Sequence, residues 1–122
     1  MKRLARLSLR LQEHRIGLIG DNGAGKSTTV AAMLERRNEK KSGHILTVED
    51  PVEYMFTSKR AVFNQREIGL DSASFGVALA NGLRQAPDVI FIGEIRDASA
   101  MGQALAYAQT GQLCISTLHA GN

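Results

Sequence analysis

The sequence has few of the features that mark secreted or membrane proteins. It holds one cysteine, Cys114, in 122 residues, so neither an internal disulfide nor a cysteine metal cluster can form, and we expect this residue to be a small buried hydrophobe. The longest unbroken apolar runs are five residues, Val30–Leu34 and Ala104–Ala108, whereas a membrane-spanning helix needs about 18. Residues 1–15 lack the continuous apolar stretch of a secretory signal. We therefore expect a cytoplasmic protein without a transmembrane segment.

Positive charge is concentrated at the N-terminus. The chain has a formal net charge of +3, and residues 1–15 hold five basic residues and one acidic residue, so the rest is nearly neutral. That distribution argues against a broad nucleic-acid-binding face. Leu4, Leu7 and Leu11 share a helical face with arginines beside them, so we expect a basic amphipathic helix over 2–13. Such a helix could pack on the domain or bind an anionic membrane surface or partner.

Length and hydrophobic periodicity predict one α/β domain. A chain of 122 residues that is 43% hydrophobic can bury one core, and we divide it into an N-terminal segment, 1–15, and a core, 16–122. The predicted strands are 16–19, 45–48, 89–92 and 113–117, with a weaker edge strand at 61–64. The predicted helices are 26–37, one from Ser72 or Ser74 to before Pro87, and one between Asp97 and Gly111, with Met101, Leu105 and Ala108 on one face. This alternation predicts a mainly parallel sheet with helices on both faces.

A glycine-rich loop follows the first predicted strand. Residues 20–27, GDNGAGKS, match the pattern G-x-x-x-x-G-K-[S/T] at every required position, between a strand and a helix. Several backbone N–H groups of such a loop face one point, and the helix N-terminus adds partial positive charge, which suits a polyphosphate. Lys26 would reach the β- and γ-phosphates, and the Ser27 hydroxyl would bind Mg²⁺. The predicted nucleotide-binding residues are Gly20, Asp21, Asn22, Gly23, Ala24, Gly25, Lys26, Ser27 and Thr28.

Acidic residues follow two of the predicted strands. Glu49, Asp50 and Glu53 come after the strand at 45–48, and Glu94 follows the strand at 89–92, where a Walker B carboxylate would stand. Ligands of a parallel sheet gather at the carboxyl ends of its strands, the edge that also carries the glycine-rich loop. Mg²⁺ prefers oxygen ligands, and a water that attacks the γ-phosphate needs an acceptor to orient it. These carboxylates therefore suit a hydrolytic site.

Structural roles remain open for the same residues. Glu49 and Asp50 could cap a turn, and Glu94 could pair with Arg96 at the surface. The phosphate loop makes the functional interpretation the favoured one. His119, two residues beyond the last predicted strand, could sense the γ-phosphate, although a histidine in such a place is more often structural.

Four segments resemble motifs of the secretion and pilus ATPases of type II secretion systems and type IV pili. They are 83–97 (LRQAPDVIFIGEIRD), similar to the family's signature around the Walker B strand, 43–54 (GHILTVEDPVEY), similar to its aspartate box, 64–67 (NQRE), similar to its short following motif, and 110–119 (TGQLCISTLH), similar to its histidine box. All four come in family order. Residues 43–122 resemble the PilT/PilU-like twitching-motility branch, nearer PilU.

The resemblance implies a RecA-like P-loop NTPase core with ATP and Mg²⁺ as cofactors. It implies that Glu53 activates the attacking water, that Glu94 acts at the γ-phosphate and together with Ser27 at the metal, and that His119 couples phosphate state to conformation. The implied assembly is a hexameric ring that works on an inner-membrane pilus platform protein, at the inner face of the bacterial inner membrane. ATP hydrolysis by that ring would drive pilus disassembly.

The sequence departs from the family pattern in three places. Gln112 stands where the histidine box has its first histidine. The glycine-rich loop is more similar to that of ABC-type ATPases than to the family's usual GPTGSGK loop. No LSGGQ signature follows it, which excludes an ABC protein. The N-terminal regulatory domain, the remaining core strands and the C-terminal domain of the family have no counterpart. We therefore expect a fragment of the nucleotide-binding core, truncated at both ends.

Two alternatives to an active motor follow from these departures. Arginines from the absent N-terminal region and from neighbouring subunits normally stabilise γ-phosphate charge, and an arginine finger contributes about 10³ to 10⁵ in rate. The chain could therefore be a catalytically weak or inactive nucleotide-binding module that docks on full-length subunits. A nucleic-acid translocase of similar core would bind polynucleotides tightly, and the near-neutral body argues against it.

Overall fold

The computed structural model describes residues 15–20, 26–70, 73–93 and 98–119, and the amphipathic helix expected at 2–13 lies outside them. The strands are β1 (Arg15–Gly20), β2 (Gly43–Glu49), β3 (Ala61–Glu67), β4 (Val89–Ile92) and β5 (Leu113–His119). The helices are α2 (Lys26–Lys40), α3 (Phe75–Leu83) and α4 (Ala98–Ala108). Each strand predicted from the sequence is present, including the edge strand, which is longer than expected.

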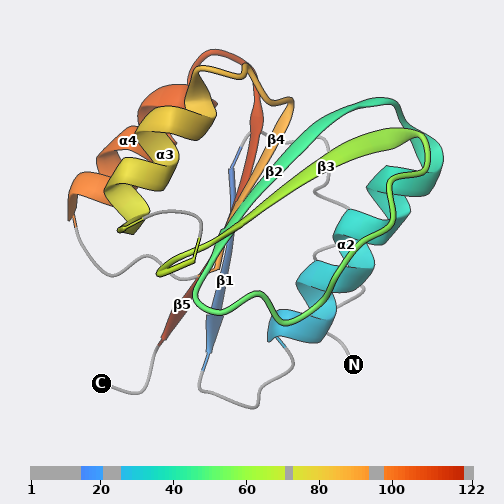
Figure 1. The fold of residues 1–122 in the computed structure, drawn as a ribbon, viewed down its shortest axis with the longest axis horizontal. Helices are drawn as coiled ribbons and strands as arrows, with labels where there is room; N and C mark the ends of the chain where they lie inside the picture. The colour runs from blue at the N-terminus through green and yellow to red at the C-terminus, as the bar shows by residue number, and fades with distance from the viewer. Residues whose placement is uncertain (1–14, 21–25, 71–72, 94–97, 120–122) are drawn as a thin grey trace.

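The strands form one sheet in the order β1-β5-β4-β2-β3, and every neighbouring pair is parallel. From β1 through β2 to β3 the chain moves toward one edge of the sheet, and from β3 through β4 to β5 it moves back. Because parallel crossovers are right-handed, the two directions place their connections on opposite faces. Figure 1 shows α2 on one side of the sheet and α3 with α4 on the other. The predicted parallel sheet with helices on both faces is confirmed.

The core has two halves separated by the sheet. Side chains at alternate strand positions point to opposite faces, so Ile45 and Phe91 pack toward α2. Their chain neighbours Leu46 and Ile90 pack toward α3 and α4. The central strands are buried on both faces, which explains why they are continuous apolar runs in the sequence.

Cys114 lies in the half of the core under α3 and α4. It is buried and forms no disulfide. Burial raises the pKa of its thiol to about 11, so the thiol stays protonated at physiological pH. The expected role as a small buried hydrophobe is confirmed.

Two helix ends have the predicted caps. The side chain of Ser74 accepts a hydrogen bond from the backbone N–H of Val77 at the start of α3. Gly111 follows α4 with a φ of 103°, a conformation that favours glycine. The alternative cap at Ser72 and the Asp97 cap of α4 lie outside the described residues.

The buried face of α4 differs from the prediction. Leu105 was expected to share the buried face with Ala108, but Leu105 is 37% exposed while Ala104 and Ala108 are each 1% exposed. Small side chains let a helix approach its neighbours closely, and Ala104 and Ala108 pack in the cluster that holds Leu46 and Ile90. Size therefore decided which face of this helix is buried.

Helix α2 continues past its predicted end at Arg37 to Lys40. Asn38, a polar residue beyond the predicted end of the helix, is 0% exposed. Its side-chain amide donates to the carbonyl of Thr57 over 2.8 Å, and its amide oxygen accepts from the backbone N–H of Lys59 over 2.9 Å. Asn38 is thus a buried contact between α2 and the segment before β3.

Among the described residues, none of the helices combines the length and the apolar character needed to cross a bilayer.

Candidate active site

The predicted site residues belong to segments that follow the carboxyl ends of the strands. Gly20, the last residue of β1, pairs in register with His119, the last residue of β5. Val48 pairs with Ile92 near the ends of β2 and β4. Because the sheet is parallel, all of these ends lie at one edge, the lower edge in Figure 1. The topology therefore brings together four segments that are far apart in the sequence.

The glycine-rich loop joins β1 to the N-terminus of α2. Gly20 ends the strand and Lys26 begins the helix, whereas residues 21–25 and the side chains of Lys26 and Ser27 lie outside the described part of the chain. Thr28 is exposed in the first turn of α2. That turn holds no acidic residue, so the partial positive charge of the helix N-terminus is not neutralised from within the helix. This end of α2 suits an anion.

Gly93 brings the ends of β2 and β4 into close contact. Its backbone N–H donates to the carbonyl of Val48 over 2.8 Å. A Cβ atom at this position would lie 3.3 Å from the Cα of Glu49, a distance tighter than most side-chain contacts. Glu94 follows directly, but its own placement lies outside the described residues. The close approach brings the backbone that leads to Glu94 against the end of β2.

Glu49 is a half-buried carboxylate at the end of β2. The Thr47 hydroxyl donates to its Oε2 over 2.9 Å. Burial raises the pKa of Glu49, and hydrogen bonds from Thr47, the Gln65 side chain and the Glu53 backbone oppose the rise. Nearby negative charge on Glu53 adds to the rise. The structure therefore brings Glu49 and Glu53 together.

Glu53 lies on the extended segment that connects β2 to β3. Its side chain is exposed. Both chain neighbours of Glu53 form backbone hydrogen bonds with side chains of β3. The backbone N–H of Val52 donates to Oε1 of Glu67 over 2.7 Å, and the carbonyl of Tyr54 accepts from the Gln65 side chain over 2.8 Å. An exposed carboxylate on a fixed backbone can reach a ligand at this edge of the sheet.

His119 and Gln112 lie at opposite ends of β5. His119 ends the strand beside Gly20, although its side chain lies outside the described residues. Gln112 precedes the strand, and since β5 has seven residues that rise about 3.3 Å each, the two lie roughly 20 Å apart. The Gln112 side chain lies next to Thr110. The departure from the family pattern at Gln112 thus falls at the far edge of the sheet from the glycine-rich loop.

Sequence reasoning placed Thr47, Gln65 and Glu67 in family-like motifs but assigned none of these three polar residues a role of its own. Thr47 is fully buried in β2, and a polar residue inside an apolar strand was the available signal. Gln65 and Glu67 stand two residues apart on β3 and so share one face. Their hydrogen-bond partners lie in the segment between β2 and β3, and the path of that segment does not follow from the sequence. No group of three or more potential metal ligands forms within the described residues, and the predicted metal ligands Ser27 and Glu94 have side chains outside that part.

Comparison with known proteins identifies the family. The family model described as "Type II/IV secretion system protein" matches residues 2–122. The chain is 54% identical over 104 residues to the type IV pilus ATPase PilU of Pseudomonas aeruginosa, an alignment that covers 85% of this chain and 27% of that protein. It is 49% identical over 100 residues to the pilus retraction ATPase PilT of the same species, which covers 82% of this chain and 29% of PilT.

Solved structures agree with the sequence comparisons. The crystal structure of the pilus retraction motor PilT with bound ADP superposes with a TM-score of 0.88 at 47% identity and covers 93% of this chain and 34% of that one. The ATPase DotB of Legionella pneumophila superposes with a TM-score of 0.87 at 31% identity, over 97% of this chain and 34% of that one. The chain thus spans about a third or less of the length of these relatives, and its α/β fold is a RecA-like core. It belongs to the type II/IV secretion system protein family, in the twitching-motility ATPase branch.

Proposed function

We propose that this chain is the ATP-binding and ATP-hydrolysing core of a ring-forming pilus retraction motor. The observation that carries the proposal is the convergence of the ends of β1, β2, β4 and β5 at one edge of the sheet. In the sequence, the glycine-rich loop connects β1 to α2. A phosphate-binding loop surrounded by carboxylate-bearing segments has the parts needed for phosphoryl transfer to water. The similar proteins PilU and PilT are named as pilus ATPases.

Each predicted residue has one role in this proposal. The backbone of residues 20–25 and the Lys26 ammonium bind the phosphates, with Thr28 as a neighbouring contact. Glu53 accepts a proton from the attacking water and orients it in line with the γ-phosphate. His119, which ends the strand beside Gly20, contacts the γ-phosphate. Through this contact it couples the presence of the γ-phosphate to the conformation of β5.

The donor set at this edge fits a magnesium ion. Mg²⁺ prefers oxygen ligands and keeps several waters, and a serine hydroxyl with a carboxylate, here Ser27 and Glu94, supplies oxygens of both kinds. Gly93, which lies in close contact with Glu49 at the end of β2, directly precedes Glu94 in the sequence. A bound Mg²⁺ would neutralise phosphate charge there.

Assembly and location form the remaining part of the proposal. Rings of this branch place neighbouring subunits around each nucleotide, so we propose a homo-oligomer, a hexamer by resemblance, that acts on an inner-membrane pilus platform protein from the cytoplasmic side. The near-neutral body of the chain supports a protein partner rather than a nucleic acid.

Steady-state phosphate release in Mg-ATP tests the proposal. The expected result is turnover by the wild-type chain that vanishes in Lys26→Ala, because the phosphates lose their cation, and in Glu53→Gln, because the water loses its base. A matched control is Glu39→Gln, an exposed residue near the far end of α2, which should leave turnover unchanged.

Equal low rates in the wild-type chain and both site variants would contradict hydrolysis. That result favours the second candidate function, a nucleotide-binding module without turnover that docks on full-length subunits.

A further inference from the structure

Three consecutive residues around Glu53 have hydrogen-bonded backbones. The backbone N–H of Val52 donates to Oε1 of Glu67 over 2.7 Å. The backbone of Glu53 hydrogen-bonds to the Glu49 carboxylate. The carbonyl of Tyr54 accepts from Nε2 of Gln65 over 2.8 Å. Side chains of β2 and β3 therefore hydrogen-bond to one backbone group of each of these three residues.

Sheet register explains why these side chains meet the segment. Thr47 pairs with Gln65, and Glu49 pairs with Glu67, so the four side chains occupy the same face at the carboxyl ends of two adjacent strands. Ile45 and Phe63, two residues earlier on each strand, pack in the core half under α2. The segment that leaves β2 must return across this face because β3 is parallel to β2.

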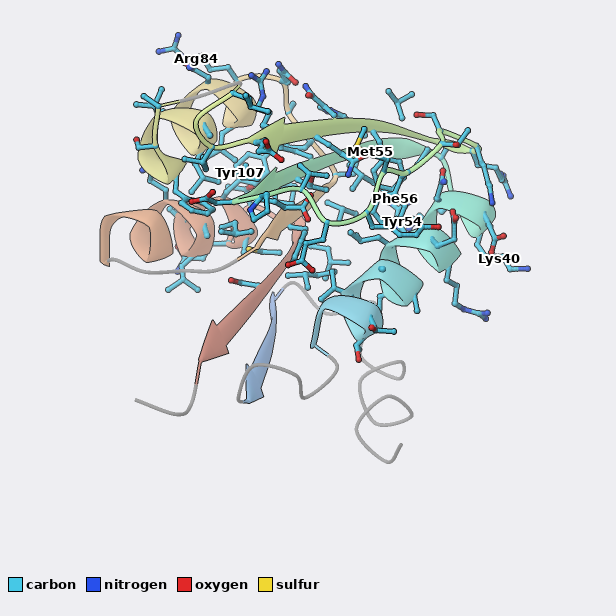
Figure 2. All side chains as sticks on the ribbon, turned by 60° about the horizontal axis from the view of Figure 1, so that its bottom comes forward. Lys40, Tyr54, Met55, Phe56, Arg84 and Tyr107 are labelled. Atoms are coloured by element: carbon cyan, nitrogen blue, oxygen red, sulfur yellow. The ribbon has the colours of Figure 1, made fainter. Side chains whose placement is uncertain are left out.

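Aromatic packing at Phe56, two residues beyond Tyr54, also holds the segment. The rings of Phe56 and Phe63 stack with their centroids 4.5 Å apart. The rings of Tyr54 and Phe56 pack edge to face with their centroids 4.7 Å apart. The backbone N–H of Phe56 donates to Oε1 of Gln65 over 3.0 Å, so Gln65 bridges Tyr54 and Phe56. Figure 2 shows Tyr54, Met55 and Phe56 gathered beside α2 and β3, away from Tyr107 at α3 and α4.

We propose that Gln65 and Glu67 are positioning residues for the catalytic carboxylate of Glu53. They act through the peptide groups on either side of it and do not touch the nucleotide. This inference rests on the proposed function, because it assigns the geometry of the same site. It gives Gln65 and Glu67, two residues of the segment 64–67, a role in catalysis rather than in stability alone.

Rate is the quantity that such positioning changes. A displacement of about 1 Å in a catalytic group can lower the rate about 100-fold, whereas the phosphates are bound by residues on β1 and α2. Loss of either positioning side chain should therefore lower kcat about 10- to 100-fold and leave nucleotide affinity within about twofold.

Two variants of Glu67 distinguish the loss of its hydrogen-bond acceptor from the loss of its negative charge. Glu67→Ala removes the acceptor for the Val52 N–H, whereas Glu67→Gln keeps a side-chain oxygen at the same reach. The expected result is a low kcat for Glu67→Ala and recovery of most of the rate in Glu67→Gln, measured by phosphate release. Asn64→Ala is the matched control, because Asn64 lies on the same strand and hydrogen-bonds to Gln85 instead of the Glu53 segment. It should keep the wild-type kcat.

A wild-type kcat in both Glu67→Ala and Gln65→Met would overturn the proposal, and so would a parallel loss of nucleotide affinity and rate. These outcomes differ from failure of the proposed function, in which the wild-type chain turns over no faster than Lys26→Ala.

Amide hydrogen exchange decides the proposal even without turnover. The amides of Val52, Glu53 and Phe56 should be protected in the wild-type chain and should lose protection in Gln65→Met or Glu67→Ala, while amides in β4 keep theirs. Rapid exchange of those three amides in the wild-type chain would overturn the proposed positioning.

Discussion

Glu49 is subject to two opposing effects on a single carboxyl group. Removal from water disfavours the charged form, while the Thr47 hydroxyl, the Gln65 side chain and the Glu53 backbone stabilise that form by hydrogen bonding. Burial is the larger effect, so the pKa of Glu49 is raised. In the folded state this carboxyl therefore keeps its proton to higher pH than it does in the unfolded chain.

The raised pKa of Glu49 predicts a pH-dependent contribution to stability. The contribution is fully present below the ordinary glutamate pKa, about 4.3, and is lost as the pH rises through the folded-state pKa. Urea unfolding of the wild-type chain and Glu49→Gln at pH 4 and pH 7 measures it. The stability of the wild-type chain relative to the variant should fall between pH 4 and pH 7. A difference that stays constant, or moves in favour of the wild-type chain, contradicts the raised pKa.

The sequence predicted the roles of some residues of the site but not of others. The glycine-rich loop was predicted from its own residue pattern, whereas the role of Glu53 was predicted from the resemblance of residues 43–54 to the family's aspartate box. Gln65 and Glu67 were not assigned roles, because their partners lie in a segment whose path depends on how β3 joins the sheet. A polar residue on an edge strand has the same pattern whether it faces water or holds a neighbouring segment.

At the scale of elements, α3 lies so close to the sheet that one of its positions must be glycine. A Cβ atom at Gly82 would lie 2.4 Å from Cδ2 of Leu46, a buried core residue. Gly82→Ala should therefore lower the free energy of unfolding by about 1 to 3 kcal/mol through overpacking. Thermal or urea unfolding measures the loss.

The matched control for Gly82 is Gly102→Ala in α4. Gly102 is exposed in a helix interior. Apart from its chain neighbours and the helix's own backbone, no atom lies within 4 Å of the Cβ that alanine would add. This substitution should raise stability by about 0.5 to 1 kcal/mol, because alanine favours the helix. Equal effects of the two substitutions would contradict the close approach of α3 to the sheet.

Asn38 joins α2 to the segment that precedes β3. Its amide oxygen accepts from the backbone N–H of Lys59 and of Ala61, and its amide nitrogen donates to the carbonyl of Thr57. Asn38→Ala would leave buried backbone groups unpaired and should cost about 2 to 4 kcal/mol of unfolding free energy.

Urea unfolding of Asn38→Ala and of Arg36→Ala tests the role of Asn38. Arg36 is an exposed residue on the same helix, so its replacement should change the free energy of unfolding by no more than about 0.5 kcal/mol. A similarly small change in Asn38→Ala would show that the segment before β3 is held by other contacts.

The sequence predicted the type and order of the elements better than their faces and ends. The strand at 89–92 was predicted at its observed bounds, because a short apolar run after a proline has few other interpretations. The predicted burial of Leu105 in α4 and the predicted end of α2 were wrong, because close packing at Ala104 and the buried contacts of Asn38 are tertiary effects. Residues 53–60 carry no periodic signal, since polar side chains of neighbouring elements hold them.

At the scale of the whole molecule, the order of the strands creates the candidate site. The chain moves outward from β1 to β3 and returns to place β5 beside β1, so Gly20 and His119 become neighbours although they are far apart in the sequence. The short motifs could be recognised in the sequence one by one. Their convergence could not, because it depends on the sheet order and on the side of the sheet that each crossover takes.

Calorimetric titration of the folded chain with Mg-ATP tests the central claim, that a nucleotide binds where β1 meets α2. The account predicts heat that fits one site per chain, binding at least about tenfold weaker in Lys26→Ala because one charged phosphate contact is lost, and unchanged binding in Glu53→Gln. An absence of heat with the wild-type chain, or equal affinity of the wild-type chain and Lys26→Ala, would contradict it.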